Sequence, residues 1–119
     1  MRLSQSKISR FRECPRCFVR DRAFRVDRPR TFPYTLNNAV DLLLKKEFDV
    51  HREAGTPHPL MAAAGLDAIP LKDPRLEAWR DALHRGVRYV HTPTQFEVTG
   101  GIDDVWIDSQ GALIVVDYK

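Results

Sequence analysis

The stretch that most constrains the fold is the C-terminal sequence "GGIDDVWIDSQGALIVVDYK". Two runs rich in β-branched and aromatic residues flank the tripeptide Ser109-Gln110-Gly111, which is typical of two strands joined by a tight turn. A glycine at the third position of a three-residue loop takes the left-handed conformation that closes such a hairpin. The loop pairs Asp108 with Ala112 and thereby fixes which residues face each other along both strands.

This register predicts that two acidic side chains meet across the hairpin. Asp103 lies opposite Asp117, and Gly101 lies opposite Lys119. Carboxylates in this arrangement are about 5 Å apart at Cβ and repel each other unless a positive charge lies between them. Lys119 is one candidate for that charge. A divalent cation such as Mg²⁺ or Mn²⁺ is the other, because hard cations prefer carboxylate oxygens. We expect Gly101 to leave room there for a phosphate group.

Both faces of the predicted hairpin are mostly apolar, so we expect it to lie centrally in a covered sheet. Leu113 and Val115 share a face with Asp117 and Lys119. The opposite face holds one acid among apolar side chains: Ile102, Asp104, Trp106, Ile114, Val116 and Tyr118. The alternative is a surface hairpin, on which Asp103, Asp117 and Lys119 form only a solvated charge cluster.

A long helix is predicted over residues 35–54, with Thr35 as its cap and Gly55 after its last residue. Its apolar side chains form one stripe at helical spacing: Leu36, Val40, Leu43, Leu44 and Val50. Glu47 and His51 fall inside that stripe, one turn apart. The pattern therefore predicts that Glu47 points into the core.

The rest of the chain reads as short elements. Three are predicted: a helix capped by Ser4 or Ser6 that ends near Cys14, a helix over residues 73–86 and a strand over residues 87–91. Residues 55–72 read as loop with one short helical piece. Together with the hairpin at residues 94–119, these elements predict an α+β (α/β) fold in one domain over residues 1–119. In that fold, N-terminal helices pack on a mixed sheet with a central antiparallel hairpin.

The positive charge of the chain is concentrated at its N-terminus. Residues 1–30 carry ten basic side chains against three acidic ones, although the whole chain carries only +3. Such a surface favours a polyanionic partner, and we expect the basic segment of residues 1–33 to contact DNA. The candidate contact residues are Lys7, Arg10, Arg12, Arg16 and Arg20.

The hydropathy pattern contains neither the roughly 18 consecutive apolar residues of a membrane span nor the apolar core of a signal peptide. We therefore expect no membrane contact and a cytoplasmic location.

Three segments, in this order, resemble the PD-(D/E)XK nuclease superfamily, in the RecB-like branch that contains CRISPR-associated exonucleases: "LSQSKISRFRECPRCF", "GGIDDVWID" and "GALIVVDYK". The resemblance covers the two ends of the chain. It implies a restriction-endonuclease-like core in which Asp103 and Asp117 hold Mg²⁺ or Mn²⁺ and Lys119 is the catalytic lysine. In such sites the metal ion and the lysine activate water for attack on a phosphodiester.

Members of the superfamily also place an acid or a histidine on the helix before the sheet, and two residues compete for that role here. Counting from Asn37 along the Gly-x-x-x-His pattern of the branch selects Asp41. The apolar stripe of the helix instead selects Glu47, with His51 beside it. We favour Glu47 as the third metal ligand, because the stripe places it in the middle of the face expected to be buried.

The two cysteines, Cys14 and Cys17, form a Cys-x₂-Cys pair and are expected as buried thiols. A zinc site or an iron–sulfur cluster would need further soft ligands. Iron–sulfur members of the branch take three cysteines from a C-terminal cluster, which this sequence lacks. We therefore expect no cluster on this chain.

The leading hypothesis is a metal-dependent deoxyribonuclease of the RecB-like type, acting in DNA repair, recombination or CRISPR-related processing. One alternative is a nuclease-like module that binds nucleic acid or a protein partner without cutting. Another is a structural domain whose Asp–Lys pair is only a salt bridge. Members of the superfamily continue beyond the acid-x-Lys strand, so we also expect a longer reading frame or a protein partner to complete the sheet.

Overall fold

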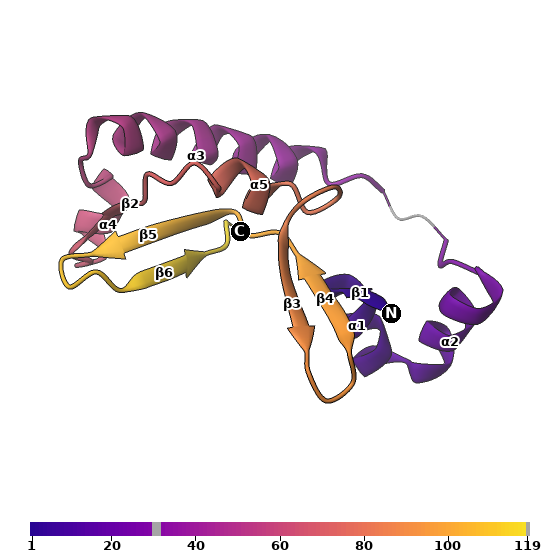
Figure 1. Cartoon of the computed structure of the whole chain (residues 1–119). Helices are drawn as coiled ribbons and strands as arrows, with labels where there is room; N and C mark the ends of the chain where they lie inside the picture. Colours follow the sequence, from indigo (N-terminus) through magenta and orange to yellow (C-terminus); the bar gives the residue numbers. More distant parts are fainter. Residues whose placement is uncertain (30–31, 119) are drawn as a thin grey trace. The chain divides into compact units, whose positions relative to one another are not determined.

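The computed structural model describes residues 1–29 and 32–118, and it has the predicted α+β composition (Figure 1). The sequence pattern suggests a single domain, whereas the chain forms two compact units. The first unit combines Met1–Pro33 with Val87–Gly100, and the second combines Tyr34–Gly86 with Gly101–Lys119. Each unit has its own small sheet of three strands.

The first unit contains the basic N-terminal segment. Its elements are β1 (Arg2–Ser4), α1 (Gln5–Glu13), α2 (Pro15–Phe24), β3 (Val87–His91) and β4 (Phe96–Gly100). Ser4 caps α1, because its side chain accepts a hydrogen bond from the backbone N–H of Lys7. The sheet has the order β1-β4-β3, with β1 parallel and β3 antiparallel to β4. The predicted N-terminal helix and the predicted strand at residues 87–91 are both confirmed.

The second unit contains the long helix and the hairpin. Its elements are α3 (Thr35–Ala54), α4 (Pro59–Ala63), β2 (Ala68–Pro70), α5 (Leu76–Arg80), β5 (Asp104–Asp108) and β6 (Leu113–Val116). The sheet is antiparallel with the order β2-β5-β6, and α3 lies along one of its faces (Figure 1). The core is centred on Phe48, whose ring stacks on those of Trp106 and His58 with centroids 5.2 and 4.0 Å away.

The register of the hairpin is the predicted one. Asp104 pairs with Val116, Trp106 pairs with Ile114, and the N–H of Asp108 donates to the carbonyl oxygen of Ala112 across the loop. Gly111 closes the loop with φ +85°, a left-handed conformation that side chains with a Cβ rarely adopt. The predicted hairpin at residues 94–119 is too long, because Phe96–Gly100 pairs with β3 in the first unit.

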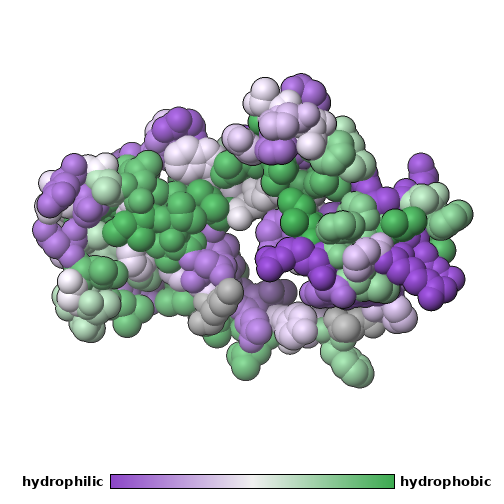
Figure 2. All heavy atoms as spheres, turned by 90° about the horizontal axis from the view of Figure 1, so that it is seen from below, coloured by the Kyte–Doolittle hydropathy of each residue, from purple (hydrophilic) through white to green (hydrophobic). Residues whose placement is uncertain are grey.

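The expectation that both faces of the hairpin are covered is wrong for the described residues. Leu113 and Val115 on β6 are exposed, while Ile114 and Val116 on the other side are half-buried. The reason is that α3 covers only one face of this sheet. Figure 2 views the molecule from below, and hydrophobic side chains gather there over the hairpin.

The long helix has the predicted bounds but a different buried face. Gly55 ends it in the left-handed region at φ +65°, as expected, whereas Tyr34 rather than Thr35 stands at the cap position. Its buried residues are Phe48 and Arg52, and the apolar stripe chosen from the sequence is largely exposed: Leu36, Val40, Leu43 and Val50. The helix turns its aromatic residue and its paired polar residues toward the sheet, so the prediction that the aliphatic stripe is buried is wrong.

The segments between the long helix and the first unit's strands correct one expectation and confirm another. The predicted helix over residues 73–86 is reduced to Leu76–Arg80, preceded by a turn in which Asp73 accepts a hydrogen bond from the N–H of Arg75. The short helical piece expected in the loop after Gly55 is α4. In the described part of the chain, no helix combines the length and the hydropathy required to cross a lipid bilayer.

The core position of Phe48 gives a stability prediction. Its side chain is 1% exposed, so Phe48→Ala should lower the free energy of unfolding by about 3–5 kcal/mol through lost burial and a cavity. Leu43, which the sequence pattern places in the core but which is 63% exposed, serves as the matched control: Leu43→Ala should change stability by less than about 0.5 kcal/mol. Chemical denaturation followed by tryptophan fluorescence measures both. A larger loss for Leu43→Ala would contradict the observed orientation of α3.

Candidate functional site

The two acids predicted to meet across the hairpin do meet. Asp103 lies at the bend before β5 and Asp117 directly after β6, and their side chains are in contact, Asp103 half-buried and Asp117 exposed. Oδ2 of Asp103 also accepts the backbone N–H of Tyr118 at 3.0 Å, while Oδ1 accepts the Lys45 ammonium at 3.0 Å. Burial raises the pKa of Asp103, but these hydrogen bonds together bring that pKa below its usual value.

A lysine missed by the sequence analysis supplies positive charge at this point. Lys45 on α3 donates to Oδ2 of Asp41 at 2.8 Å and to Oδ1 of Asp103 at 3.0 Å. Burial lowers the pKa of Lys45, and the two carboxylates raise it, with a net upward shift. The signal in the sequence is the spacing of Asp41 and Lys45, which lie one helical turn apart and therefore share a face.

Glu47, the helix acid favoured from the sequence, does not lie with Asp103. Its side chain is 60% exposed, and its Oε1 is 3.0 Å from Nε2 of the buried His58. Nδ1 of His58 accepts the backbone N–H of Leu60, which leaves Nε2 as the ring nitrogen next to Glu47. The placement of Glu47 at the hairpin is therefore wrong. Asp41, the competing residue, is the helix acid that shares Lys45 with Asp103.

Two other expectations concern the end of the hairpin. Lys119, the proposed catalytic lysine, lies outside the described residues. The open space expected at Gly101 is not present, because a Cβ added there would lie 2.7 Å from Cβ of Ala82. The segment after α5 packs directly on the Gly101 backbone, which explains why a residue without a side chain stands there.

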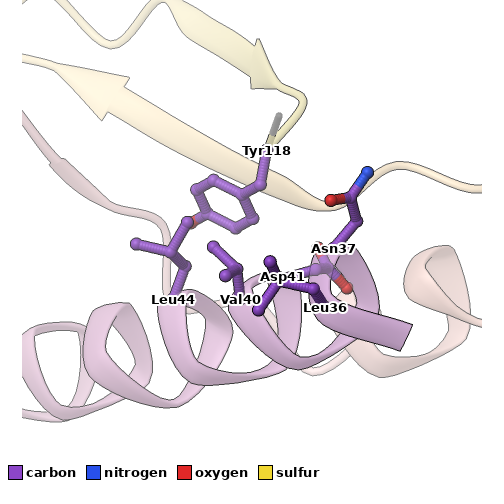
Figure 3. A pocket seen from close by; sticks show the side chains of 6 residues that line it. All are labelled: Leu36, Asn37, Val40, Asp41, Leu44 and Tyr118. Atoms are coloured by element: carbon purple, nitrogen blue, oxygen red, sulfur yellow. The ribbon is translucent and has the colours of Figure 1, made fainter. Parts of the chain in front are cut away.

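A hollow of about 430 Å³ lies next to Asp41, between α3 and the end of the hairpin. Figure 3 shows the ring of Tyr118 over the helix, facing Leu44 and Val40. The remaining lining residues are Leu36, Asn37 and Asp41. The hollow is thus mainly apolar, and Asn37 and Asp41 supply polar groups to its lining.

A buried ionic network lies directly behind the acids. Asp104 is fully buried, and both of its carboxylate oxygens accept hydrogen bonds from Nη2 of Arg52, at 2.6 and 2.8 Å. Oδ2 also accepts the hydroxyl of Tyr118 at 2.6 Å. Burial, followed by this bond to Asp104, strongly raises the pKa of Tyr118, so the hydroxyl remains a donor at physiological pH.

The same network holds the backbone at Asp103. Nε of Arg80 donates to the carbonyl oxygen of Asp103 at 2.8 Å, and its Nη1 donates to Asp49 at 3.0 Å. Asp49 also accepts Nε of Arg52 at 3.1 Å. Burial raises the pKa of Asp49, and its bonds to the two arginines bring that pKa below the usual value. Both residues that flank the pair of acids, Asp104 and Tyr118, are therefore fixed by hydrogen bonds.

The donor set fits a hard divalent cation that keeps several of its waters. Mg²⁺ is commonly held by one or two carboxylates together with water and phosphate oxygens. Asp103 and Asp117 provide two such carboxylates in contact, and Asp41 lies on the other side of Lys45. Among residues 1–29 and 32–118, no three His, Cys, Asp or Glu side chains are grouped closely enough to hold a metal ion by themselves.

The predicted DNA-contacting residues lie in the first unit and fall into two groups. Nζ of Lys7 is 2.5 Å from Asp21, and Nη1 of Arg10 lies 3.0 Å from Asp21 and 2.9 Å from Asp27. The other three are exposed on α1 and α2: Arg12, Arg16 and Arg20. Lys7 and Arg10 therefore serve the internal packing of the two helices, and the exposed arginines form the basic surface.

Comparison of the chain with protein-family models, with curated proteins and with solved structures gives no match. The resemblance to the PD-(D/E)XK superfamily therefore rests on the three sequence motifs.

The buried ion pair behind the site gives a second stability prediction. Arg52→Met leaves the Asp104 carboxylate buried without its main partner, so the free energy of unfolding should fall by about 3–5 kcal/mol. Arg52→Lys keeps the charge but loses the other guanidinium bonds, to Asp49 and to the carbonyl oxygen of Leu71, so its loss should be smaller. As a control, Lys72→Met removes an exposed ion pair with Glu53 and should cost less than about 1 kcal/mol. Equal losses for Arg52→Met and Lys72→Met in urea unfolding would contradict a structural role for the pair.

The lowered pKa of Asp103 gives a pH-dependent prediction. Because its folded-state pKa lies below the ordinary value of about 3.9, ionised Asp103 stabilises the fold above that pH. This contribution is lost as the pH falls through the lowered pKa. The stability difference between wild type and Asp103→Asn should therefore be largest near pH 7 and shrink between about pH 5 and 2. Urea unfolding at a series of pH values measures it, with the exposed Asp67→Asn as a control whose difference stays nearly constant. A wild-type advantage that grows on acidification would contradict the assignment.

Proposed function

We propose that the chain acts as a metal-dependent nuclease that hydrolyses DNA phosphodiester bonds in the cytoplasm. The observation that carries the proposal is the contact between Asp103 and Asp117. The register of the hairpin brings these two acids together, and Asp117 belongs to the acid-x-Lys motif that ends at Lys119. Two carboxylates this close repel each other, which favours binding of a cation next to them; Lys45 supplies one such charge in the metal-free protein. Phosphodiester hydrolysis at such a site needs no cofactor beyond a divalent metal ion.

In this proposal, Asp103 and Asp117 hold Mg²⁺ or Mn²⁺, and Asp41 replaces Glu47 as the acid from the helix. The bound ion supplies charge for the phosphate and lowers the pKa of a water molecule. Asp41 is supported because it shares the Lys45 ammonium with Asp103, whereas Glu47 pairs with His58. Lys119 keeps the role that the family resemblance implies, orienting the attacking water.

DNA binding in this proposal uses the exposed arginines of the first unit: Arg12, Arg16 and Arg20. Arginine contacts to phosphate contribute affinity without sequence preference, and the affinity falls as salt rises. Lys7 and Arg10 are left out because their charges are already neutralised by Asp21 and Asp27.

A second candidate function is a nuclease-like module that binds nucleic acid without cutting it. The observation that favours it is the Lys45 ammonium, which already compensates Asp41 and Asp103 in the absence of any metal ion. A fold whose acids are satisfied in this way can present its basic surface without catalysing hydrolysis.

Cleavage of radiolabelled DNA by the protein expressed from its full reading frame tests the proposal. Wild type should cut in Mg²⁺ or Mn²⁺ and stop when the metal is chelated. Asp117→Asn and Lys119→Ala should each reduce the rate at least about 10²-fold, because each removes a group that acts on the reacting phosphate. Asp41→Asn and Glu47→Gln are a matched pair of neutralised acids on the same helix. The first should reduce cleavage strongly, and the second should leave it close to wild type.

The outcomes separate the candidates. If wild type does not cut but binds DNA in a salt-dependent way, the enzyme proposal fails and the binding module remains. If it neither cuts nor binds, both fail. If Glu47→Gln abolishes cutting while Asp41→Asn does not, the nuclease survives with the helix acid that the sequence pattern favours.

A further inference from the structure

The Cys-x₂-Cys pair, which the proposed function does not use, lies where the two helices of the first unit meet. Cys14 follows the last residue of α1 and is also the N-cap of α2. Its Sγ accepts the backbone N–H of Cys17 at 3.1 Å and a second backbone hydrogen bond from Arg16. A helix N-terminus presents unpaired N–H groups of this kind and thereby stabilises negative charge on a sulfur atom.

The second cysteine is placed to react with the first. Cys17 lies in the first turn of α2, three residues after Cys14, and the two thiols are in side-chain hydrogen-bonding contact. Residues at this spacing have Cβ atoms about 5–6 Å apart, and a disulfide requires about 4 Å. Cys14 has the extended backbone of an N-cap, with φ −155° and ψ 94°, so closing the disulfide requires rearrangement at the start of α2.

Hydrogen bonds, more than charge, distinguish the two sulfur atoms, because the side chain and backbone N–H of Cys17 both donate to Cys14. The guanidinium of Arg28 donates to Oε2 of Glu13 at 3.0 Å and also contacts the Cys17 side chain. The hydrogen bond from the Cys17 thiol, the backbone N–H groups and the charge of Arg28 lower the pKa of Cys14 against the opposing effect of burial. Both thiols are only half-buried, so a small reagent can reach them.

We propose that Cys14 and Cys17 form a redox-active dithiol that exchanges with low-molecular-weight disulfides of the glutathione type. The Cys14 thiolate attacks one sulfur of the small disulfide, forms a mixed disulfide and releases one small thiolate. Cys17 then loses its proton to solvent, and its sulfur attacks Sγ of Cys14 and expels the second small thiol. The protein dithiol is oxidised by two electrons to the Cys14–Cys17 disulfide, and the small disulfide is reduced to two thiols.

This assignment differs from a structural role and from metal binding. A purely structural thiol is buried in apolar surroundings, which suppress ionisation, whereas Cys14 faces N–H donors and an arginine. A soft-metal site would require further ligands, and the described residues contain no group of three His, Cys, Asp or Glu side chains suited to one. The inference is independent of nuclease activity.

The test uses the whole protein, equilibrated in buffers with increasing ratios of oxidised to reduced glutathione, then alkylated and analysed by mass spectrometry. We expect a reversible loss of two hydrogen atoms that maps to a Cys14–Cys17 disulfide. Brief treatment of the reduced protein with iodoacetamide near pH 7 should label Cys14 about tenfold faster than Cys17. Arg28→Gln should slow the labelling of Cys14, and Arg22→Gln, at an exposed arginine of α2, should leave it unchanged.

The variants of the cysteines distinguish the steps. Cys17→Ser should accumulate a stable mixed disulfide between Cys14 and glutathione, because the resolving thiol is absent. Cys14→Ser should react slowly and form little adduct. The proposal is overturned if the wild-type protein accumulates glutathione adducts but forms no internal disulfide at any ratio of oxidised to reduced glutathione. This measurement uses the wild type only, so it does not depend on whether a variant folds. Tight binding of one zinc ion by the reduced pair, with no disulfide formed in its absence, also overturns it and makes the pair a metal site.

Discussion

The second unit depends on the burial of one charge, the Asp104 carboxylate. A fully buried carboxylate is tolerated only when a partner and hydrogen bonds replace its hydration. Arg52 from α3 and the Tyr118 hydroxyl supply them directly, and Arg80 from α5 adds its charge at 3.6 Å. Because these three groups come from a helix, the end of the hairpin and a second helix, a single carboxylate fixes how those elements pack in this unit. The orientation of α3 follows, since Arg52 can reach Asp104 only if the face of Phe48 and Arg52 is turned toward the sheet.

The pair Asp103 and Asp104 shows how this burial shapes the candidate site. Consecutive residues at the start of a strand point to opposite sides, so holding Asp104 inside directs Asp103 toward Asp117 and Lys45. Arg80 reinforces the arrangement by binding the carbonyl oxygen of Asp103 while Tyr118 donates its N–H to the side chain. The outward acid is thus preorganised by an ionic network centred on the fully buried Asp104. Preorganisation of this kind is what metal and phosphate sites require of the residues behind their ligands.

The parts of the fold that sequence reasoning predicted are those decided by neighbouring residues. Gly111 and a three-residue loop determine the register, and Gly55 and Ser4 mark helix ends through local backbone chemistry. The parts that it missed are decided at long range. Phe96–Gly100 pairs with β3 rather than joining the hairpin, which no local pattern specifies. The buried face of the helix was predicted wrongly because a search for an apolar stripe assigns Arg52 and Lys45 to the solvent side. Burial of each becomes favourable when it pairs with a carboxylate of the hairpin, Asp104 or Asp103. The sequence did contain one signal for the buried face of the helix. Asp104 stands on the apolar face of the hairpin, and a buried carboxylate there requires a cationic side chain on the helix that covers that face.

Lys45 connects the electrostatics of the candidate site to the choice between the two proposed functions, hydrolysis and binding without cutting. Its ammonium and a divalent ion would satisfy the same carboxylate of Asp103, and two cations cannot share that position without repelling each other. Asp41 resolves the conflict, because it gives Lys45 a second partner at 2.8 Å that it keeps when Asp103 is taken by another cation. An ammonium held by Asp41 next to a metal-bound phosphate would then add positive charge where negative charge develops. The same i,i+4 pair therefore stabilises the metal-free fold and is compatible with a charged site, whereas Glu47 pairs with His58.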